Sequence, residues 1–117
     1  MRIGCPTEIK NHEYRVGLTP ESARELITHG HEVWIQSGAG NGIGADDDQY
    51  RQAGAFIKDG PDAIFAECEM VVKVKEPQAE ERAKLRDGQI LYTYLHLAPD
   101  APQTADLVKN GVTAIAY

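Results

Sequence analysis

The sequence predicts an α/β fold, a doubly wound and mostly parallel β-sheet with helices on both faces. Short apolar runs alternate with polar helical segments along the chain, and regular β-α alternation with right-handed crossovers produces a parallel sheet. A glycine stands at four of the passages from helix to strand, where it can end a helix in the left-handed conformation. These passages are His29–Ile35, Ala53–Ile57, Arg86–Leu91 and Asn110–Ile115.

Six strands and five helices are expected in alternation. The strands are expected at Arg2–Cys5, Glu32–Gln36, Ala55–Lys58, Met70–Lys75, Gln89–Leu95 and Val112–Ala116. The first helix has a clear start, because Thr19, Pro20 and Glu21 supply a capping hydroxyl, a proline at the first helical position and an acid in the first turn. It should run to about His29. The other helices are expected from Asp46 to just before Gly54, from Pro61 to Cys68, from Gln78 to Arg86 and from Pro102 to Lys109.

Length and composition restrict the function. A chain of 117 residues forms one domain. Its net charge of -6 argues against nucleic acid and anionic membranes as partners, because phosphate binding needs a cationic surface. No apolar run has the length of a bilayer span and the N-terminus lacks a signal-peptide core, so a cytoplasmic location is expected. The two cysteines, Cys5 and Cys68, are read as core residues, and no metal site is expected.

Three basic side chains follow the expected strand ends. Arg15 lies in the unusually long loop after the first strand, Lys75 precedes Glu76-Pro77 after the fourth, and His96 ends the fifth. Open parallel sheets bind ligands beyond the carboxyl ends of their strands. Side-chain alternation would also put Tyr94 on the same side of the sheet as His96.

This convergence predicts a pocket for a small anion. Arginine can bind a carboxylate through two parallel hydrogen bonds, and lysine can polarise a further oxygen. Histidine, with an ordinary pKa of about 6.5, can exchange a proton with a carbonyl or hydroxyl near neutral pH. The same residues can also have purely structural roles. The histidine could be hydrogen-bonded within the fold, Lys73 and Lys75 could be solvated, and Arg15 could pair with Glu8 or Glu13.

Several segments of the chain resemble the N-terminal domain of the alanine dehydrogenase and pyridine nucleotide transhydrogenase family, and the likeness spans residues 1–117. These segments are Met1–Asn11, Glu13–Val16, Leu18–Pro20, Gly30–Val33, Ser37–Gly40, Lys73–Pro77 and Leu95–Ala98. The resemblance implies a Rossmann-like or flavodoxin-like substrate domain of an NAD-dependent enzyme that interconverts L-alanine with pyruvate and ammonia. It implies that Arg15 and Lys75 bind the pyruvate or alanine, that His96 is the acid/base, and that Tyr94 lines the pocket.

The resemblance also implies parts that these residues do not supply. The NAD-binding domain and a C-terminal segment that completes the substrate domain are expected outside this chain, so cofactor-binding residues are not assigned here. These 117 residues alone are therefore expected not to turn over alanine, and the full-length enzyme is expected to be a homo-oligomer. Without that C-terminal segment, the domain should expose apolar surface, and such surface promotes association.

Other functions remain open at this stage. One is a docking domain like that of the transhydrogenase α subunit, in which the positions of Lys75 and His96 are expected to carry other residues. Another is a free-standing domain that binds a small anion or a partner. A receiver-like signalling domain is rejected, because the first strand ends in Cys5-Pro6 where a receiver needs acids.

Some motifs are set aside. Gly40–Ala45 fits the G-x-G-x-x-G/A pattern of dinucleotide-binding turns, but Asp46, Asp47 and Asp48 would repel a pyrophosphate at the following helix start. It is interpreted as a structural turn. His29 and His31 are interpreted as helix-end residues and Trp34 as a core residue.

Overall fold

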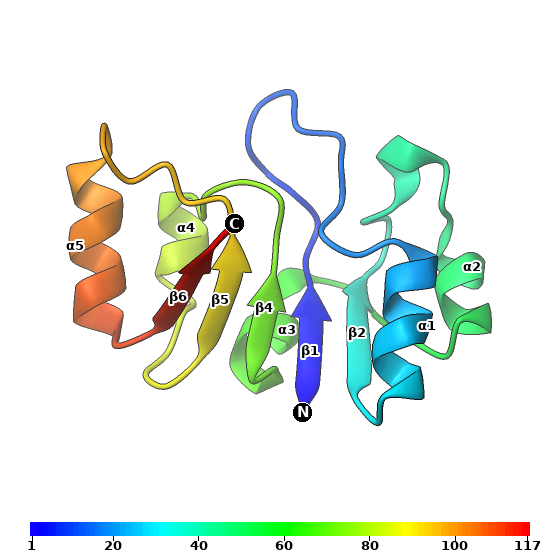
Figure 1. Cartoon of the computed structure of the whole chain (residues 1–117). Helices are drawn as coiled ribbons and strands as arrows, with labels where there is room; N and C mark the ends of the chain where they lie inside the picture. Colours follow the sequence, from blue (N-terminus) through cyan, green and yellow to red (C-terminus); the bar gives the residue numbers. More distant parts are fainter.

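The computed structural model describes all residues from Met1 to Tyr117 and contains one six-stranded sheet. Every pair of neighbouring strands is parallel, and the strand order is β3-β2-β1-β4-β5-β6 (Figure 1). The strands are β1 (Arg2–Cys5), β2 (Glu32–Gln36), β3 (Phe56–Lys58), β4 (Met70–Val72), β5 (Ile90–Thr93) and β6 (Thr113–Ala116). The helices are α1 (Pro20–Thr28), α2 (Asp47–Gln52), α3 (Pro61–Glu67), α4 (Ala79–Arg82) and α5 (Ala101–Asn110), with a short 3₁₀ helix, η1 (Asn41–Ile43), between β2 and α2. None of these helices combines the length and the apolar character that crossing a bilayer requires.

The helices cover both faces of the sheet, as predicted. In β1, Ile3 and Cys5 pack into a core cluster that includes Ala23 of α1 and Tyr50 of α2. The intervening Gly4 points the other way, because strand side chains alternate between faces, and a Cβ there would meet Ile64 of α3. A second cluster on the α3 face joins side chains of α3, β4, β5 and α5, among them Phe65, Val71, Leu91 and Leu107. The expected doubly wound architecture is therefore confirmed.

The predicted element ends were correct for some elements and wrong for others. The bounds of β1 and β2 match the prediction, but β4 ends at Val72 instead of Lys75, and β5 ends at Thr93 instead of Leu95. The expected helix from Gln78 to Arg86 is shorter, because only Ala79–Arg82 is helical. After β4 the chain bends at Val74 and Lys75, and the Lys73 side chain between β4 and this bend is 1% exposed and turns into the interior.

The long loop between β1 and α1 rises above the carboxyl ends of the strands (Figure 1). At its end, the buried Tyr50 hydroxyl donates a hydrogen bond to the Leu18 carbonyl at 2.7 Å. Gly42 lies so close to this loop that a Cβ would stand 2.1 Å from the Tyr14 carbonyl oxygen. The Thr19 hydroxyl then accepts the Ser22 N–H and caps α1, as the sequence predicted. These contacts hold the loop against the region after β2.

One part of the sheet has no helix over it. All four residues of the edge strand β6 are exposed. Tyr92 and its register partner Ile115 are 37% and 42% exposed, on the face that α1 and α2 cover further along the sheet. This face therefore exposes apolar side chains. Apolar sheet surface at an edge favours contact with another protein surface.

The close packing of β1 against α3 makes a stability prediction. Replacing Gly4 by alanine puts a methyl group 2.5 Å from Ile64 Cγ2 and 2.7 Å from Cys68 Sγ in a fully packed region. We expect Gly4→Ala to lower the free energy of unfolding by about 1–3 kcal/mol, because overpacked cores must shift. Gly60→Ala is the matched control, since a Cβ there meets nothing within 4 Å. Urea unfolding of both variants measures the difference, and equal stabilities would contradict this account of the β1–α3 contact.

Candidate functional site

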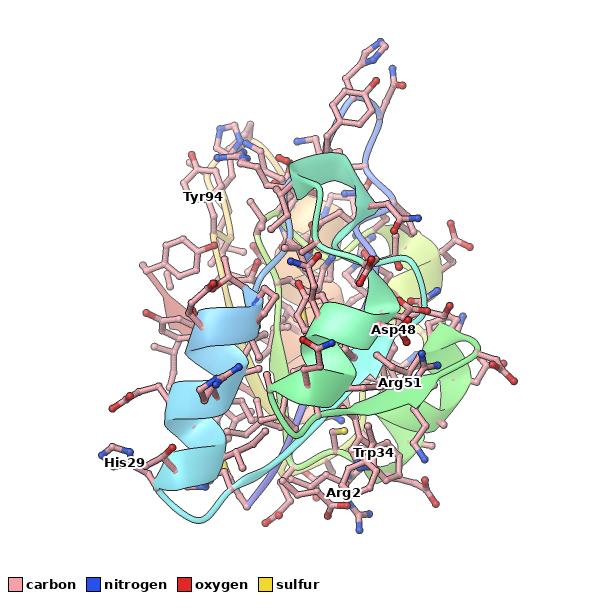
Figure 2. All side chains as sticks on the ribbon, turned by 90° about the vertical axis from the view of Figure 1, so that its right-hand side faces the viewer. Arg2, His29, Trp34, Asp48, Arg51 and Tyr94 are labelled. Atoms are coloured by element: carbon pink, nitrogen blue, oxygen red, sulfur yellow. The ribbon has the colours of Figure 1, made fainter.

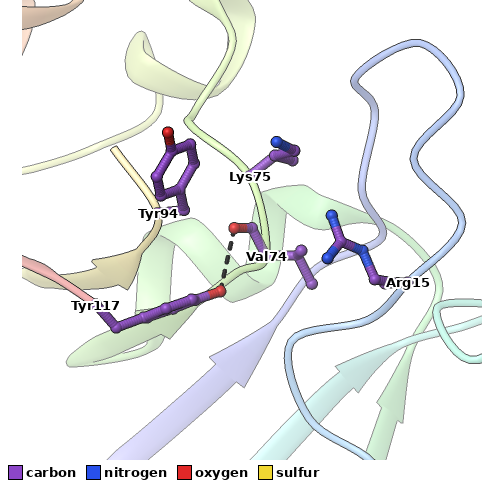
Figure 3. A pocket seen from close by; sticks show the side chains of 5 residues that line it. All are labelled: Arg15, Val74, Lys75, Tyr94 and Tyr117. Carbon is purple, nitrogen blue, oxygen red and sulfur yellow. Dashed lines mark hydrogen bonds between the residues drawn. The ribbon is translucent and has the colours of Figure 1, made fainter. Parts of the chain in front are cut away.

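A hollow lies at the carboxyl edge of the sheet, above β4 and β5 (Figure 3). Its volume is about 260 Å³. It lies beside the point between β1 and β4 where the strand order reverses, which is the usual ligand position in an open parallel sheet. The lining residues are Arg15, Val74, Lys75, Tyr94 and Tyr117. Three of the four predicted site residues therefore line one hollow, whereas Val74 and Tyr117 were missed.

Lys75 and Tyr94 form one wall of this hollow. The Lys75 ammonium stands 5.0 Å from the centre of the Tyr94 ring, a distance at which a cation is attracted to an aromatic face. The Tyr117 hydroxyl lies 2.9 Å from the Lys73 carbonyl oxygen and 3.1 Å from that of Val74, so it can donate to either (Figure 3). The sequence signal for this residue was its place directly after the expected strand Val112–Ala116, at the edge where ligands bind.

Arg15 enters the hollow from the N-terminal loop and is paired with Glu13. Its Nε and Nη2 atoms donate to the two Glu13 oxygens at 2.9 and 2.6 Å. The Arg15 side chain is 64% exposed and the Glu13 side chain only 7%. The hydrogen bonds from the guanidinium lower the pKa of Glu13 to about 2. The Arg15–Glu13 ion pair that the sequence suggested as an alternative is therefore present. It uses the Nε and Nη2 side of the guanidinium and leaves the Nη1 side for another group.

His96 lies near the hollow but does not line it. Its ring centre is 5.6 Å from that of Tyr94, and the side chain is exposed. The expectation that strand alternation orients His96 was wrong, because β5 ends at Thr93 and His96 has a positive φ of 49°. Left-handed backbone at a residue other than glycine is uncommon and is found at functional sites. The role of His96 as acid/base remains a prediction.

A buried cluster of charges adjoins the hollow. The Lys73 ammonium lies 3.1 Å from Glu8 Oε1 and 3.0 Å from Glu81 Oε2, and all three side chains are at most 5% exposed. Burial raises the pKa of Glu81, against the opposing effect of Lys73. The reading of Lys73 as a solvated residue was wrong. Nothing in the local pattern around Lys73 indicated the pairing with Glu8, because Glu8 is 65 residues away.

The glycine-rich turn after β2 binds its own carboxylates. The Asp47 side chain accepts hydrogen bonds from the Gly38 N–H at 2.9 Å and from the Ser37 hydroxyl at 2.6 Å, and these bonds lower the pKa of Asp47. Asp46 caps α2 through Gln49. A pyrophosphate would have to displace a carboxylate here, so these residues do not fit a dinucleotide.

The residues set aside in the sequence lie far from the hollow. Figure 2 shows Tyr94 at one end of the molecule and Arg2, His29 and Trp34 at the other. Trp34 is 6% exposed and packs with Ile64 and Cys68. Burial raises the pKa of both Cys5 and Cys68 to about 12, so neither has the thiolate character that thiol chemistry needs.

The fold and the hollow together define a doubly wound α/β ligand-binding domain whose site lies at the strand-order reversal. The family described as alanine dehydrogenase/PNT, N-terminal domain matches residues 4–117. The chain belongs to this family, as its sequence motifs predicted.

Comparison with known proteins agrees with this assignment. The chain is 50% identical over 117 residues to the alanine dehydrogenases of Halomonas elongata and Mycolicibacterium smegmatis, and it covers 32% of each. A solved L-alanine dehydrogenase structure matches with a TM-score of 0.97 and 49% identity over 100% of this chain and 32% of that one. A transhydrogenase structure from Sinorhizobium meliloti matches with a TM-score of 0.92 and 25% identity over 99% of this chain and 34% of that one. The chain thus spans about a third of the length of these relatives.

The Arg15–Glu13 pair makes a titration prediction. A carboxyl group whose pKa is lowered in the folded state stabilises the fold above its ordinary pKa, and this contribution is lost as the pH falls toward the lowered value. We expect Arg15→Ala to return the Glu13 pKa from about 2 toward 4.5, measured by carboxyl-detected NMR. Arg51→Ala, which breaks the separate pair with Asp48, should leave it unchanged. A Glu13 pKa near 4.5 in the parent chain would contradict the pairing.

Proposed function

We propose that the chain is the substrate domain of an NAD-dependent L-alanine dehydrogenase, which converts L-alanine, NAD and water to pyruvate, ammonia and NADH. The observation that carries this proposal is the convergence of Arg15 and Lys75 on one hollow. In an otherwise acidic chain, two cations at the ligand edge of the sheet suit a small carboxylate. The family of the chain and the names of its relatives support alanine and pyruvate as that carboxylate.

The two cations have different tasks in this proposal. Because Glu13 uses Nε and Nη2 of Arg15, the remaining guanidinium N–H groups are available to the substrate carboxylate. Lys75 then donates to the keto oxygen of pyruvate, which draws electron density from the carbon that reacts. Tyr94 confines the substrate from the side and holds the Lys75 ammonium near its ring face. Fixing the keto acid in this way lowers the barrier through orientation.

His96 moves the proton. After hydride leaves alanine, water adds to the imino carbon, and the neutral imidazole accepts a proton from that water as the carbinolamine forms. The imidazolium then gives its proton to the amino nitrogen, the C–N bond breaks and ammonia leaves, and the neutral imidazole takes the hydroxyl proton of the carbinolamine as the keto oxygen forms. His96 must turn toward the hollow for this step, and its exposed position after β5 leaves it free to do so.

The hydride acceptor is the nicotinamide of NAD. We propose that it is bound outside these residues, because Asp47 already takes the Ser37 hydroxyl and the Gly38 N–H beside the Gly40–Ala45 turn. This chain therefore contributes substrate binding and proton exchange. A cytoplasmic, homo-oligomeric enzyme is proposed with it.

The second candidate is a transhydrogenase-type docking domain, favoured by the shared fold at 25% identity. Lys75 and His96 argue for the amino-acid enzyme, because a docking domain has no use for an ammonium and an imidazole beside an anion-sized hollow. Capture of a membrane-bound partner by the protein would support docking instead.

Binding of pyruvate tests the hollow directly. We expect pyruvate to shift the NMR signals of Arg15, Lys75 and Tyr94 in the folded chain, and NADH to shift none of them. Arg15→Ala should abolish the pyruvate shifts because the carboxylate loses its bidentate partner. Arg51→Ala, which removes an arginine far from the hollow, should retain them. Pyruvate shifts that survive in Arg15→Ala would contradict the proposed binding mode.

The proton transfer makes a kinetic prediction. In the intact enzyme that carries this domain, we expect His96→Ala to reduce kcat by about a hundredfold or more, the usual loss of a general acid/base. His29→Ala is the control, because that imidazole bonds to the Glu25 carbonyl at the end of α1. Steady-state oxidation of alanine measures both variants, and unchanged turnover without His96 would remove it from the mechanism.

A further inference from the structure

Glu8 has contacts beyond its ion pair with the buried Lys73. Its Oε2 accepts the Val74 N–H at 3.0 Å, and its Oε1 accepts the Lys75 N–H at 3.0 Å. Glu8 is 8% exposed. Hydrogen bonds from backbone N–H groups to an ionised carboxylate are stronger than those to a neutral acceptor. One side chain from the N-terminal loop thus holds two successive peptide groups of the segment that carries Lys75.

The segment 73–75 depends on such side-chain contacts because it lies beyond the end of β4. The Thr93 hydroxyl donates to the Lys75 carbonyl at 2.8 Å. Tyr117 donates to the carbonyl of Lys73 or Val74 on the same stretch. Buried backbone groups outside a ladder need partners of this kind. Backbone bonds still join Lys73 N–H to the Tyr92 carbonyl and the Val74 carbonyl to Tyr94 N–H. The N–H groups of Val74 and Lys75, however, are held by Glu8 alone, and the Lys75 carbonyl is held by the Thr93 hydroxyl.

Glu81 provides the comparison within the same cluster. It pairs with Lys73 just as Glu8 does, but its other oxygen accepts the Gln78 N–H at the start of its own helix. It accepts no backbone N–H group of residues 73–75, whereas Glu8 accepts two. The two carboxylates therefore share the task of neutralising Lys73 and differ in whether they touch the bend.

We propose that Glu8 is a positioning residue for Lys75. It fixes the peptide groups on either side of Val74, so that the Lys75 side chain leaves the bend toward the Tyr94 ring and the hollow. It does not touch the substrate itself. Stability alone gives a weak reason for such a cluster, because apolar replacements of buried ion pairs are often as stable. The inference rests on the proposed function, in which Lys75 binds the keto oxygen.

The test compares Glu8→Gln with Glu81→Gln in the intact enzyme. Both changes remove one charge from the cluster and keep the side-chain size. We expect Glu8→Gln to raise the KM for pyruvate by about tenfold or more, because one of the two peptide N–H groups loses a charged acceptor. The KM for NADH should stay within about twofold, and Glu81→Gln should leave both KM values near the parent's.

A physical measurement accompanies the kinetics. Hydrogen–deuterium exchange of the peptide that contains residues 73–76, followed by mass spectrometry, should be faster in Glu8→Gln and unchanged in Glu81→Gln. If Glu8→Gln does not fold, Thr93→Val replaces it. That change leaves the charges of the cluster in place and removes the donor to the Lys75 carbonyl, so the KM for pyruvate should again rise.

The outcomes separate the two proposals. Equal effects of Glu8→Gln and Glu81→Gln, or an unchanged KM for pyruvate in an active Glu8→Gln enzyme, would overturn the positioning role alone. A parent enzyme that does not turn over pyruvate would instead overturn the proposed function, and the exchange data would still report whether Glu8 holds the bend.

Discussion

The buried ammonium of Lys73 is the constraint on which the site depends. A charge that is 1% exposed must be compensated within the protein, and its partners come from the N-terminal loop and from α4. Just after Lys73 the chain bends away from the sheet, and the loop after β1 closes over the end of β4. The same bend and loop carry Lys75 and Arg15 to the hollow. The ligand edge of the domain is thus arranged around an interaction that no ligand touches.

The parts of the fold that could be predicted are those with local physical causes. The bounds of β1 and β2 follow from short apolar runs between polar or glycine-rich neighbours, and α1 begins where Thr19 and Pro20 require it. The end of β4 could not be predicted from Glu76-Pro77, because the residues that follow it are held by Glu8, which is 65 residues from Lys73. No local pattern carries that information.

The candidate site, too, could be predicted from the sequence only in part. The strand-end rule of parallel sheets was enough to bring Arg15, Lys75 and Tyr94 together. It did not reveal Tyr117, whose role depends on β6 pairing with β5, or Glu8, whose role depends on the bend. The likeness to both dehydrogenase and transhydrogenase structures shows that this fold alone does not select a reaction.

The single tryptophan of the chain gives the domain a convenient optical property. Trp34 lies in β2 between the Arg2 guanidinium, 4.5 Å from its ring centre, and the Lys58 ammonium at 3.9 Å. It stands at the opposite end of the molecule from Tyr94 (Figure 2). Its fluorescence therefore reports the assembly of β1, β2 and β3 and is insensitive to what occupies the hollow. Trp34 fluorescence can accordingly follow folding, while the NMR signals of the residues that line the hollow follow ligand binding.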